Sequence, residues 1–330
     1  MIHSNCNGIW IFGDHRNYFQ DRVTLQLIAR AKELAEVVHT YVGVVLLGWE
    51  VDEYVLEYTA HGADKIFLVE DERLRDYSSD LFTAIIADLV REFCPEIFLI
   101  SGSDFGREIA PRIGARLLTG VSSDCIALQM DDDGNLVQIS PAFDGNALAE
   151  IRTERTFPQI ATVRPGVFTE RKHDYRGEAE LVRVKPDLSR YREKVRVRSS
   201  RKADAPASGL ERAECVVCLG KGAARKDQMR KLQDLADLLQ AEVGCTRPLV
   251  EEGKMDHDRL IGQTGKCVRP ELLLVAGASG AVQFTAAIQT SRCIVAVNKD
   301  PGAAIFKYCD IGIVGDAASF AGRLAKELKE

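Results

Sequence analysis

The sequence lacks long hydrophobic runs and an excess of basic charge. No stretch approaches 18 consecutive apolar residues, so we expect no transmembrane helix. Lysine and arginine number 43 against 49 aspartates and glutamates, which gives a formal net charge of -6 and a pI near 5.7. A nucleic-acid-binding protein usually carries a basic face, so this charge balance argues against that class. With 46% hydrophobic residues and ten prolines, the chain is typical of a folded globular protein.

Cysteine is present without any dense pattern. The nine cysteines are scattered along 330 residues, which does not fit a secreted disulfide scaffold, and no amino-terminal cluster suits an iron–sulfur centre. The one close pair, Cys215 and Cys218, lies in an apolar run that predicts a strand, where these positions point to opposite faces. Residues 1–8 are short and polar before a strand at residues 9–12, so we expect no signal or transit peptide and a cytoplasmic protein.

The length predicts two domains, since single cores rarely exceed about 250 to 300 residues. Up to residue 120, short apolar runs alternate with segments of helical spacing, as in a doubly wound parallel sheet. The expected strands are residues 8–12, 41–47, 65–69 and 96–101, and the expected helices are residues 22–38, 52–61, 78–93 and 105–118. The predicted fold class is α/β, with two domains that each form a mainly parallel doubly wound sheet, the second Rossmann-like.

The middle of the chain carries two ambiguous segments. Residues 131–135, Asp-Asp-Asp-Gly-Asn, indicate a hairpin turn, with a calcium loop as the weaker alternative because the spaced ligands are missing. Residues 183–202 hold nine basic and two acidic residues, and residues 194–198 alternate charge with valine. That alternation predicts an exposed edge strand, or else a surface for a partner or phosphate. Residues 199–209 then predict a linker between a first domain at residues 1–198 and a second at 210–330.

The second domain repeats the order strand, glycine turn, helix three times. The expected strands at residues 214–219, 272–276 and 311–314 lead into Gly220-Lys221-Gly222, Gly277-Ala278-Ser279-Gly280 and Gly315-Asp316. The helices expected to follow are residues 226–242, a helix through residue 288, and a terminal helix. Such turns present backbone N–H groups that suit a phosphate, although any one of them alone is equally consistent with a packing turn.

A few polar residues stand at these junctions and suit a nucleotide. Ser279 can donate to a phosphate, Asn298 can bind a ribose or phosphate, and Asp316 can accept from ribose hydroxyls or an adenine amine. The segment Gly262-Gln263-Thr264-Gly265-Lys266 fits neither helix nor strand and supplies further donors, with a simple turn as its alternative reading.

The order of motifs resembles the alpha subunit of electron transfer flavoproteins. The resemblance is carried by residues 262–266, by Pro270-Glu271-Leu272, by Ser279-Gly280-Ala281-Val282-Gln283, by residues 296–301 and by residues 312–316. It extends to Cys245-Thr246-Arg247 and, in the first domain, to residues 110–112 and 161–166. It covers most of the chain and is weak before residue 100.

The resemblance implies an FAD-binding electron carrier that pairs with a beta subunit through its first domain and serves an acyl-CoA dehydrogenase or similar flavoenzyme. Pyrophosphate would lie near residues 279–283, the adenine end near Asp316, and the flavin ring near Arg247, Gln263 and Thr264. The implied cofactor-binding residues are Lys221, Thr246, Arg247, Gly262, Gln263, Thr264, Gly265, Gly277, Ser279, Gly280, Ala281, Val282, Gln283, Phe284, Asn298 and Asp316.

Two positions depart from the family pattern, and three alternatives stay open. Phe284 stands where many relatives carry histidine, and Lys221 stands where they often carry arginine, which keeps the charge and loses the bidentate fork. The first alternative is an NAD-dependent oxidoreductase, although the six histidines show no partnered nucleophile or base. The second is a structural subunit that has lost its flavin, and the third, within the family, is an electron-bifurcating complex.

Overall fold

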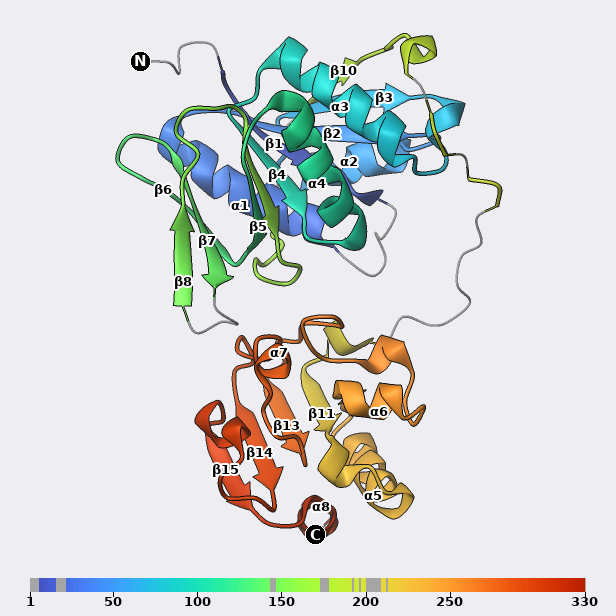
Figure 1. Cartoon of the computed structure of the whole chain (residues 1–330), viewed down its shortest axis with the longest axis vertical. Coiled ribbons are helices and arrows are strands. Elements are labelled where there is room, and N and C mark those ends of the chain that lie inside the picture. Colours follow the sequence, from blue (N-terminus) through green and yellow to red (C-terminus); the bar gives the residue numbers. More distant parts are fainter. Residues whose placement is uncertain are drawn as a thin grey trace. The chain divides into compact units, whose positions relative to one another are not determined.

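The computed structural model describes residues 6–15, 22–142, 147–172, 178–191, 193–195, 197–199, 209–211 and 213–329. The chain divides into two compact units, Met1–Ala203 and Asp204–Glu330 (Figure 1). Residues 200–208, which make up most of the predicted linker, lie outside the described residues. Within the described part of the chain, no helix is both long and apolar enough to cross a lipid bilayer.

The first unit contains a seven-stranded parallel sheet in the order β10-β3-β2-β1-β4-β9-β5. Its strands are β1 Ile9–Phe12, β2 Val42–Gly48, β3 Lys65–Glu70, β4 Ile97–Ser101, β5 Val121–Cys125, β9 Gln159–Val163 and β10 Glu180–Arg183. Its α-helices are α1 Val23–Val38, α2 Asp52–Ala60, α3 Ser79–Phe93 and α4 Asp104–Leu117. The predicted α/β class and parallel sheet are confirmed.

Helices cover both faces of this sheet, because alternate residues of a strand point to opposite sides. Ile9 and Ile11 of β1 belong to the hydrophobic core that α1 and α2 complete. Trp10 and Phe12, the intervening residues, belong to the core formed with α3 and α4. A strand buried on both faces reads as a continuous apolar run, which is why β1 and β2 are recognisable in the sequence.

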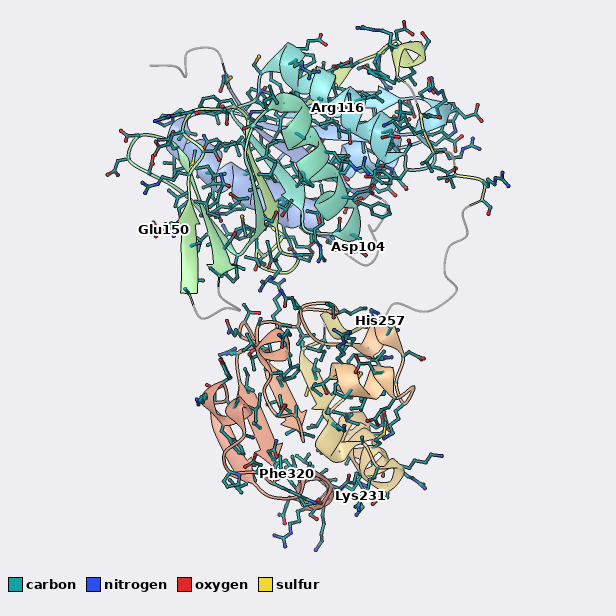
Figure 2. The ribbon with its side chains drawn as sticks, viewed as in Figure 1. Asp104, Arg116, Glu150, Lys231, His257 and Phe320 are labelled. Carbon is teal, nitrogen blue, oxygen red and sulfur yellow. The ribbon has the colours of Figure 1, made fainter. Side chains whose placement is uncertain are left out.

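Helix α4 has favourable charges at both ends. Ser103 is its N-cap and accepts a hydrogen bond from the backbone N–H of Gly106 at 3.1 Å. Asp104 lies in the first turn and Arg116 in the last turn, at the two ends of the helix in Figure 2. This arrangement complements the helix dipole, so the chain itself stabilises the amino end of α4.

A three-stranded antiparallel sheet extends the first unit, with β6 Ala127–Met130, β7 Leu136–Ala142 and β8 Ala147–Ile151. The hairpin predicted at residues 131–135 joins β6 to β7. Asp131 holds this turn, because its Oδ1 accepts from the backbone N–H groups of Asn135 at 2.8 Å and Asp133 at 3.1 Å. The hydrogen bond from Asn135 lowers the pKa of the Asp131 carboxyl below its ordinary value.

The edge strand predicted at residues 194–198 is wrong for the residues that are described there. Lys194, Val195, Val197 and Arg198 adopt no strand, and Arg196 lies outside the described residues. The free edge of β3 is already taken by β10, and the backbone N–H of Val184 continues this pairing to Leu68 O at 2.9 Å. Alternating residues form a strand only where a neighbouring strand pairs with them, and the edge strand beside β3 is β10.

The second unit contains a five-stranded parallel sheet in the order β12-β11-β13-β14-β15. Its strands are β11 Cys215–Leu219, β12 Glu242–Cys245, β13 Leu272–Ala276, β14 Ile294–Asn298 and β15 Ile311–Val314. Its α-helices are α5 Lys226–Leu238, α6 Arg247–Glu251, α7 Val282–Thr285 and α8 Ala317–Glu327. One face of the sheet packs on α5 and α8, and the other on α7 and the loops around residues 261–268 and 303–306.

Two helices of this unit are shorter than predicted. Helix α5 ends at Leu238, since Glu242 already begins β12. Helix α7 has four residues and does not continue through Ile288, because the N–H groups of Ala287 and Ile288 bond three residues back, to Phe284 O and Thr285 O. The dipole expected at residues 277–280 is therefore that of a single helical turn, and individual N–H groups matter more there.

Candidate functional site

The strand order of the second sheet places a crevice between β11 and β13. Counted along the chain, the spatial order is second, first, third, fourth, fifth, so the direction of progression reverses between these two strands. In open α/β sheets, ligands bind outside the carboxyl ends of the strands at such a switch point. The turns that follow β11 and β13 are residues 220–222 and 277–280, the glycine turns singled out in the sequence.

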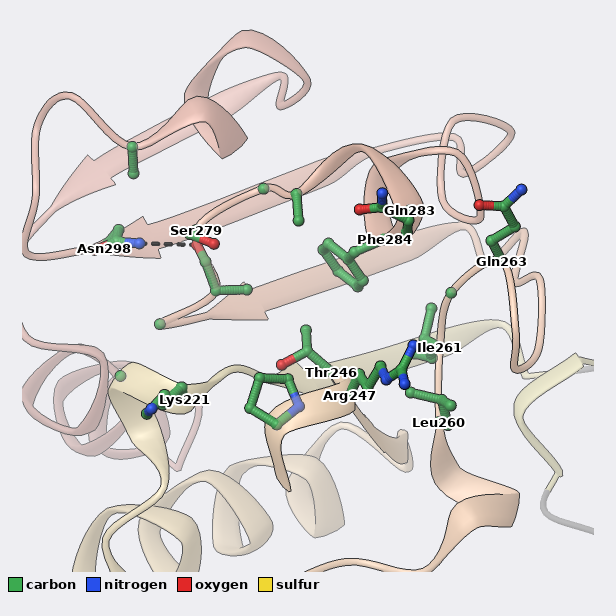
Figure 3. A pocket seen from close by; sticks show the side chains of 18 of the residues that line it. Lys221, Thr246, Arg247, Leu260, Ile261, Gln263, Ser279, Gln283, Phe284 and Asn298 are labelled. Atoms are coloured by element: carbon green, nitrogen blue, oxygen red, sulfur yellow. Dashed lines mark hydrogen bonds between the residues drawn. The ribbon is translucent and has the colours of Figure 1, made fainter. Parts of the chain in front are cut away.

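A cavity of about 630 Å³ lies at this position (Figure 3). Its volume is within the range of small-molecule and cofactor sites. All of its wall comes from the second unit: from the residues that follow β11, β12 and β13, from the loop at residues 260–264, and from the end of β14 and the residues after it. The lining residues are Lys221, Gly222, Thr246, Arg247, Pro248, Leu260, Ile261, Gly262, Gln263, Thr264, Gly277, Ala278, Ser279, Gly280, Ala281, Gln283, Phe284, Asn298, Asp300 and Ala303.

Glycine is required at two positions of these turns, because the neighbouring backbone leaves no room for a Cβ. A Cβ added at Gly220 would lie 2.4 Å from the backbone nitrogen of Ala278, in the turn after β13. Gly280 has φ of +85°, and a Cβ there would lie 2.2 Å from the backbone nitrogen of Ile305. L-residues with a side chain rarely adopt that φ. Side chains at these positions would push the two turns apart and distort the crevice.

Backbone donors at the turn after β13 have no protein acceptor. Among the described residues, no oxygen accepts from the amide N–H groups of Ser279, Gly280 and Ala281, and the Ser279 hydroxyl likewise has no partner. The backbone carbonyls of Ser279 and Ala281 are engaged, the first by Ile305 N at 3.0 Å and the second by Phe284 N at 2.9 Å. The turn is thus held in place by its acceptors while its donors remain available for an anion.

Other polar side chains of the cavity wall are also available. Within the described part of the chain, the side chains of Thr246, Gln263, Thr264 and Gln283 have no hydrogen-bond partner. The backbone N–H of Gln263 donates to Gln283 O at 2.8 Å, which fixes the loop at residues 262–266 against α7. In Figure 3 Gln283 and Ser279 lie on one side of the cavity, and Thr246 and Arg247 lie on the other.

Asn298 lines the cavity but is committed to the fold. Its Nδ2 donates to Ala278 O at 2.8 Å, and its Oδ1 accepts from the backbone N–H of Asp300 at 3.1 Å. The first bond ties the end of β14 to the turn after β13, and it is drawn as a dashed line in Figure 3. Asn298 therefore helps to fix the shape of the crevice, and the second N–H of its Nδ2 remains for a ligand.

Both cations of the cavity wall have carboxylate partners on α6 or at its end. Arg247 Nε lies 2.8 Å from Glu251 Oε1, and Lys221 Nζ lies 3.8 Å from Glu252 Oε1. Lys254 Nζ also approaches Glu252, at 2.7 Å, and its hydrogen bond lowers the pKa of that carboxyl. The charge of the wall is thus partly balanced within the chain.

Apolar side chains form the remainder of the wall. Phe284 is 5% exposed and packs in the core beneath the sheet while its ring borders the cavity. Leu260 and Ile261 contribute apolar surface that is almost fully buried in the protein. A flat aromatic ligand could bury its faces against such a wall while its polar edges reach the free donors.

All but three of the sequence-predicted residues line the cavity. The exceptions are Gly265, which closes a turn through its N–H to Gly262 O at 2.9 Å, Val282 and Asp316. Asp316 caps α8 by accepting from Ser319 N at 2.9 Å and pairs with Lys299 Nζ at 2.8 Å. The hydrogen bond from Lys299, followed by those from Ser319, holds the pKa of Asp316 well below its ordinary range.

The sequence did not assign several lining residues to the site. Most are apolar or contribute mainly backbone, so they carry no chemical signature of their own. Asp300 lies two residues after Asn298, and that proximity was the one signal that could have identified it. The unassigned residues are Gly222, Pro248, Leu260, Ile261, Ala278, Asp300 and Ala303.

Two family models match most of the chain. Residues 9–189 match the electron transfer flavoprotein domain, and residues 209–289 match the electron transfer flavoprotein FAD-binding domain. The second match includes the loop at residues 260–264 and the turn after β13, so it covers most of the cavity wall.

Curated relatives align over nearly the full length. The electron transfer flavoprotein subunit alpha of Thermoanaerobacterium thermosaccharolyticum is 36% identical over 322 residues, with 98% of each chain covered. That of Clostridium acetobutylicum is 36% identical over 334 residues, covering 100% of this chain and 99% of the relative. The lactate dehydrogenase (NAD(+),ferredoxin) subunit LctC of Acetobacterium woodii is 36% identical over 312 residues, covering 94% and 74%.

Proposed function

The chain belongs to the electron transfer flavoprotein alpha-subunit family, and we propose that it binds FAD in the cavity of its second unit and works in a heterodimer with a beta subunit. In this role it receives electrons from a dehydrogenase and passes them to a separate redox acceptor. The protein is then an electron carrier, with no substrate of its own to convert.

The observation that supports the proposal best is the set of free donors at the switch point. Three consecutive N–H groups and the Ser279 hydroxyl have no acceptor among the described residues, in a turn whose carbonyls at Ser279 and Ala281 are already engaged. A pyrophosphate matches this set, because it presents several anionic oxygens to converging N–H groups. The apolar wall at Leu260, Ile261 and Phe284 suits a planar ring at the other end of the same cavity.

In the proposed complex, each part of the wall has a distinct task. Ser279 and the backbone at residues 279–281 bind the pyrophosphate, and Gln283 extends the same row of donors. Gln263, Thr264 and Thr246 bind the polar edges of the ring system, and Arg247 places a guanidinium beside it. When bound, FAD supplies the ability to accept and return electrons. Phe284 and Ile261 exclude water from the ring and offer it no hydrogen bond.

The partner and compartment follow from the same family membership as proposals. We expect a beta subunit to bind mainly the first unit, and an acyl-CoA dehydrogenase of fatty acid β-oxidation, or a similar flavoenzyme, to donate electrons. The relative from Acetobacterium woodii is named as a subunit of a lactate dehydrogenase that uses NAD(+) and ferredoxin. That name favours, as a second candidate, a role in an electron-bifurcating complex. We place the protein in the cytoplasm, which cell fractionation can test.

The test is to purify the chain together with a beta subunit of the family and record its absorption spectrum. A flavin spectrum, with FAD released on denaturation, supports the proposal. A variant that combines Ser279→Ala with Gln283→Ala should lose FAD while it retains the beta subunit. A second flavin per heterodimer would favour the bifurcating candidate. A colourless complex that does not take up added FAD would overturn the proposal, and tight binding of NAD instead would support the NAD-dependent oxidoreductase.

A further inference from the structure

Arg247 lines the cavity and forms an ion pair with Glu251. The stability of the fold does not explain why this pair is present. Both residues belong to α6, four positions apart, with Nε and Oε1 separated by 2.8 Å. The side chains are 67% and 60% exposed, and exposed pairs contribute little to stability. Folding alone therefore gives no strong reason for the pair.

The orientation of the pair is also the opposite of the one that stabilises a helix. A carboxylate four residues before a cation is the favourable order, since it complements the helix dipole. In α6 the cation comes first and the carboxylate last, so both charges stand at the less favourable end. The advantage of this arrangement must lie outside the helix, and Arg247 lines the cavity.

Glu251 engages only one edge of the guanidinium. Nε donates to the carboxylate, while the terminal Nη1 and Nη2 groups have no acceptor among the described residues. Anchoring Nε restricts the rotation of a long side chain and leaves the two-pronged end of the guanidinium for a ligand. At the same time the carboxylate offsets part of the positive charge that a ligand in the cavity experiences.

We infer that Glu251 is a positioning residue that holds Arg247 at the cavity and limits how far its charge stabilises the reduced, more anionic flavin. The inference rests on the proposed function, because it concerns the same FAD site. Its consequence is that the midpoint potential of the bound flavin is set by the Arg247–Glu251 pair and not by Arg247 alone.

Glu251→Gln tests this directly, because the amide keeps the shape and a hydrogen-bond acceptor but loses the charge. In the heterodimer loaded with FAD, the reduced flavin should become about fivefold more tightly bound relative to the oxidised form, the factor expected for one exposed charge. The midpoint potential then rises, and the rise should shrink in 1 M salt, where exposed charges are screened.

Glu252→Gln is the matched control, since it removes the same charge from the adjacent residue, which pairs with Lys221 and Lys254. It should move the potential far less. In an Arg247→Gln background, Glu251→Gln should also lose most of its effect, because Glu251 acts through the guanidinium.

The possible failures can be told apart. A wild-type heterodimer that retains no FAD refutes the proposed function. Retained FAD with equal potentials in wild type and Glu251→Gln, or equal shifts in Glu251→Gln and Glu252→Gln, overturns the inference and leaves the proposed function standing. Glu251→Asp serves as a second variant, because it keeps the charge and should keep the wild-type potential. A potential that rises in Glu251→Asp as it does in Glu251→Gln would also contradict the inference.

Discussion

The two sheets of this chain reverse their strand order at comparable points, between β1 and β4 in the first unit and between β11 and β13 in the second. In the first unit, polar groups of the described residues at that point bond to one another. Ser103 Oγ donates to Asp14 Oδ2 at 2.8 Å, and the backbone N–H of Asp14 donates to Thr24 Oγ1 at 3.1 Å. In the second unit the N–H groups of residues 279–281 and the Ser279 hydroxyl have no acceptor in the part of the chain that the structure describes.

Both sheets have a switch point, so the topology alone does not decide whether a ligand can bind there. The side chains at the switch point decide it. Asp14 and Ser103 are at most 7% exposed, and the Ser103 hydroxyl is engaged by the Asp14 carboxylate. A buried carboxylate repels a phosphate and already stabilises the N-cap of α4. In the second unit no acidic side chain performs this task in the turn after β13, which contains only Gly277, Ala278, Ser279 and Gly280.

The largest expected effect comes from closing the open crevice of the second unit. Gly280→Ala forces a side chain into positive φ and against Ile305, at a cost of roughly 2–5 kcal/mol. We expect loss of FAD and a lower unfolding temperature, measured by flavin absorbance and thermal denaturation. Gly322→Ala is the matched control: it lies in α8 with nothing within 4 Å of the added Cβ, and it should stabilise by up to about 1 kcal/mol. Retention of FAD by Gly280→Ala would contradict the proposed site.

Removing the Arg247 guanidinium from the cavity of the second unit should change the midpoint potential of the bound flavin. Arg247→Ala should lower the midpoint potential, because one unit charge at about 4 Å and an effective dielectric near 20 contributes at most about 4 kcal/mol, on the order of 170 mV. Glu251 reduces this figure in the native protein. Arg292→Ala serves as the control, since Arg292 is also an exposed arginine in an ion pair, with Glu271 at 2.7 Å, and does not line the cavity. Equal potentials in wild type and Arg247→Ala would exclude a role for the guanidinium.

Two serine substitutions, one at the switch point of each unit, test whether the two switch points differ in this way. Ser103→Ala removes an N-cap and leaves Asp14 with one partner fewer, so it should destabilise the first unit by about 1–2 kcal/mol without altering flavin affinity. Ser279→Ala should do the reverse, lowering FAD affinity roughly fivefold to tenfold with unfolding unchanged, because its hydroxyl has no partner among the described residues. Denaturant unfolding and flavin titration of both variants provide the measurements. If both variants behave alike, the two crevices do not differ in the way described.

The smallest effect concerns Asp316, which lies outside the cavity wall. Its folded pKa is lowered by Lys299 and Ser319, so the carboxylate stabilises the fold fully above the unfolded pKa of about 3.9, and this contribution is lost progressively as the pH falls from there through the much lower folded pKa. Asp316→Asn should therefore cost up to about 1 kcal/mol near pH 6, less near pH 3, and nothing only once the pH is below the folded pKa, as measured by urea unfolding. Lys299→Met should reproduce this pattern. We expect unchanged FAD affinity, and a tenfold loss would instead support the adenine-binding role that the family resemblance implied.

Much of the fold was readable from the sequence because its signals are local. The apolar strands, the hairpin held by Asp131 and the glycine turns at residues 220–222 and 277–280 each depend on neighbouring residues. The strand expected at residues 194–198 is wrong for the described residues there, and the reason is non-local: a strand needs a neighbour to pair with, and the edge position beside β3 belongs to β10. The predicted length of helix α7 is also wrong. Its residues suit a helix, but the helix has a single turn, and residues 284, 287 and 288 pack in the core.

The candidate site was predictable to the extent that motifs mark it. Most residues assigned from motifs line the cavity, because glycines, serines and amides beside strand ends carry a chemical signature. Leu260, Ile261 and Pro248 could not be assigned, since an apolar residue looks the same in a core and in a cavity wall. Asp316 and Asn298 looked alike as nucleotide ligands, yet Lys299 and Ala278 respectively engage them.

The sequence by itself determined the fold class and the family, and it predicts two domains. These features depend on periodicity and on motif order along the chain. The tertiary structure alone decided which polar groups are satisfied by the protein and which remain for a ligand. Hydrogen bonds between residues far apart in sequence make that choice, as Ser103 and Asp14 do in the first unit and as Asn298 does at Ala278 in the second. For this reason two similar switch points in one chain differ, among the described residues, in the polar groups that they leave for a ligand.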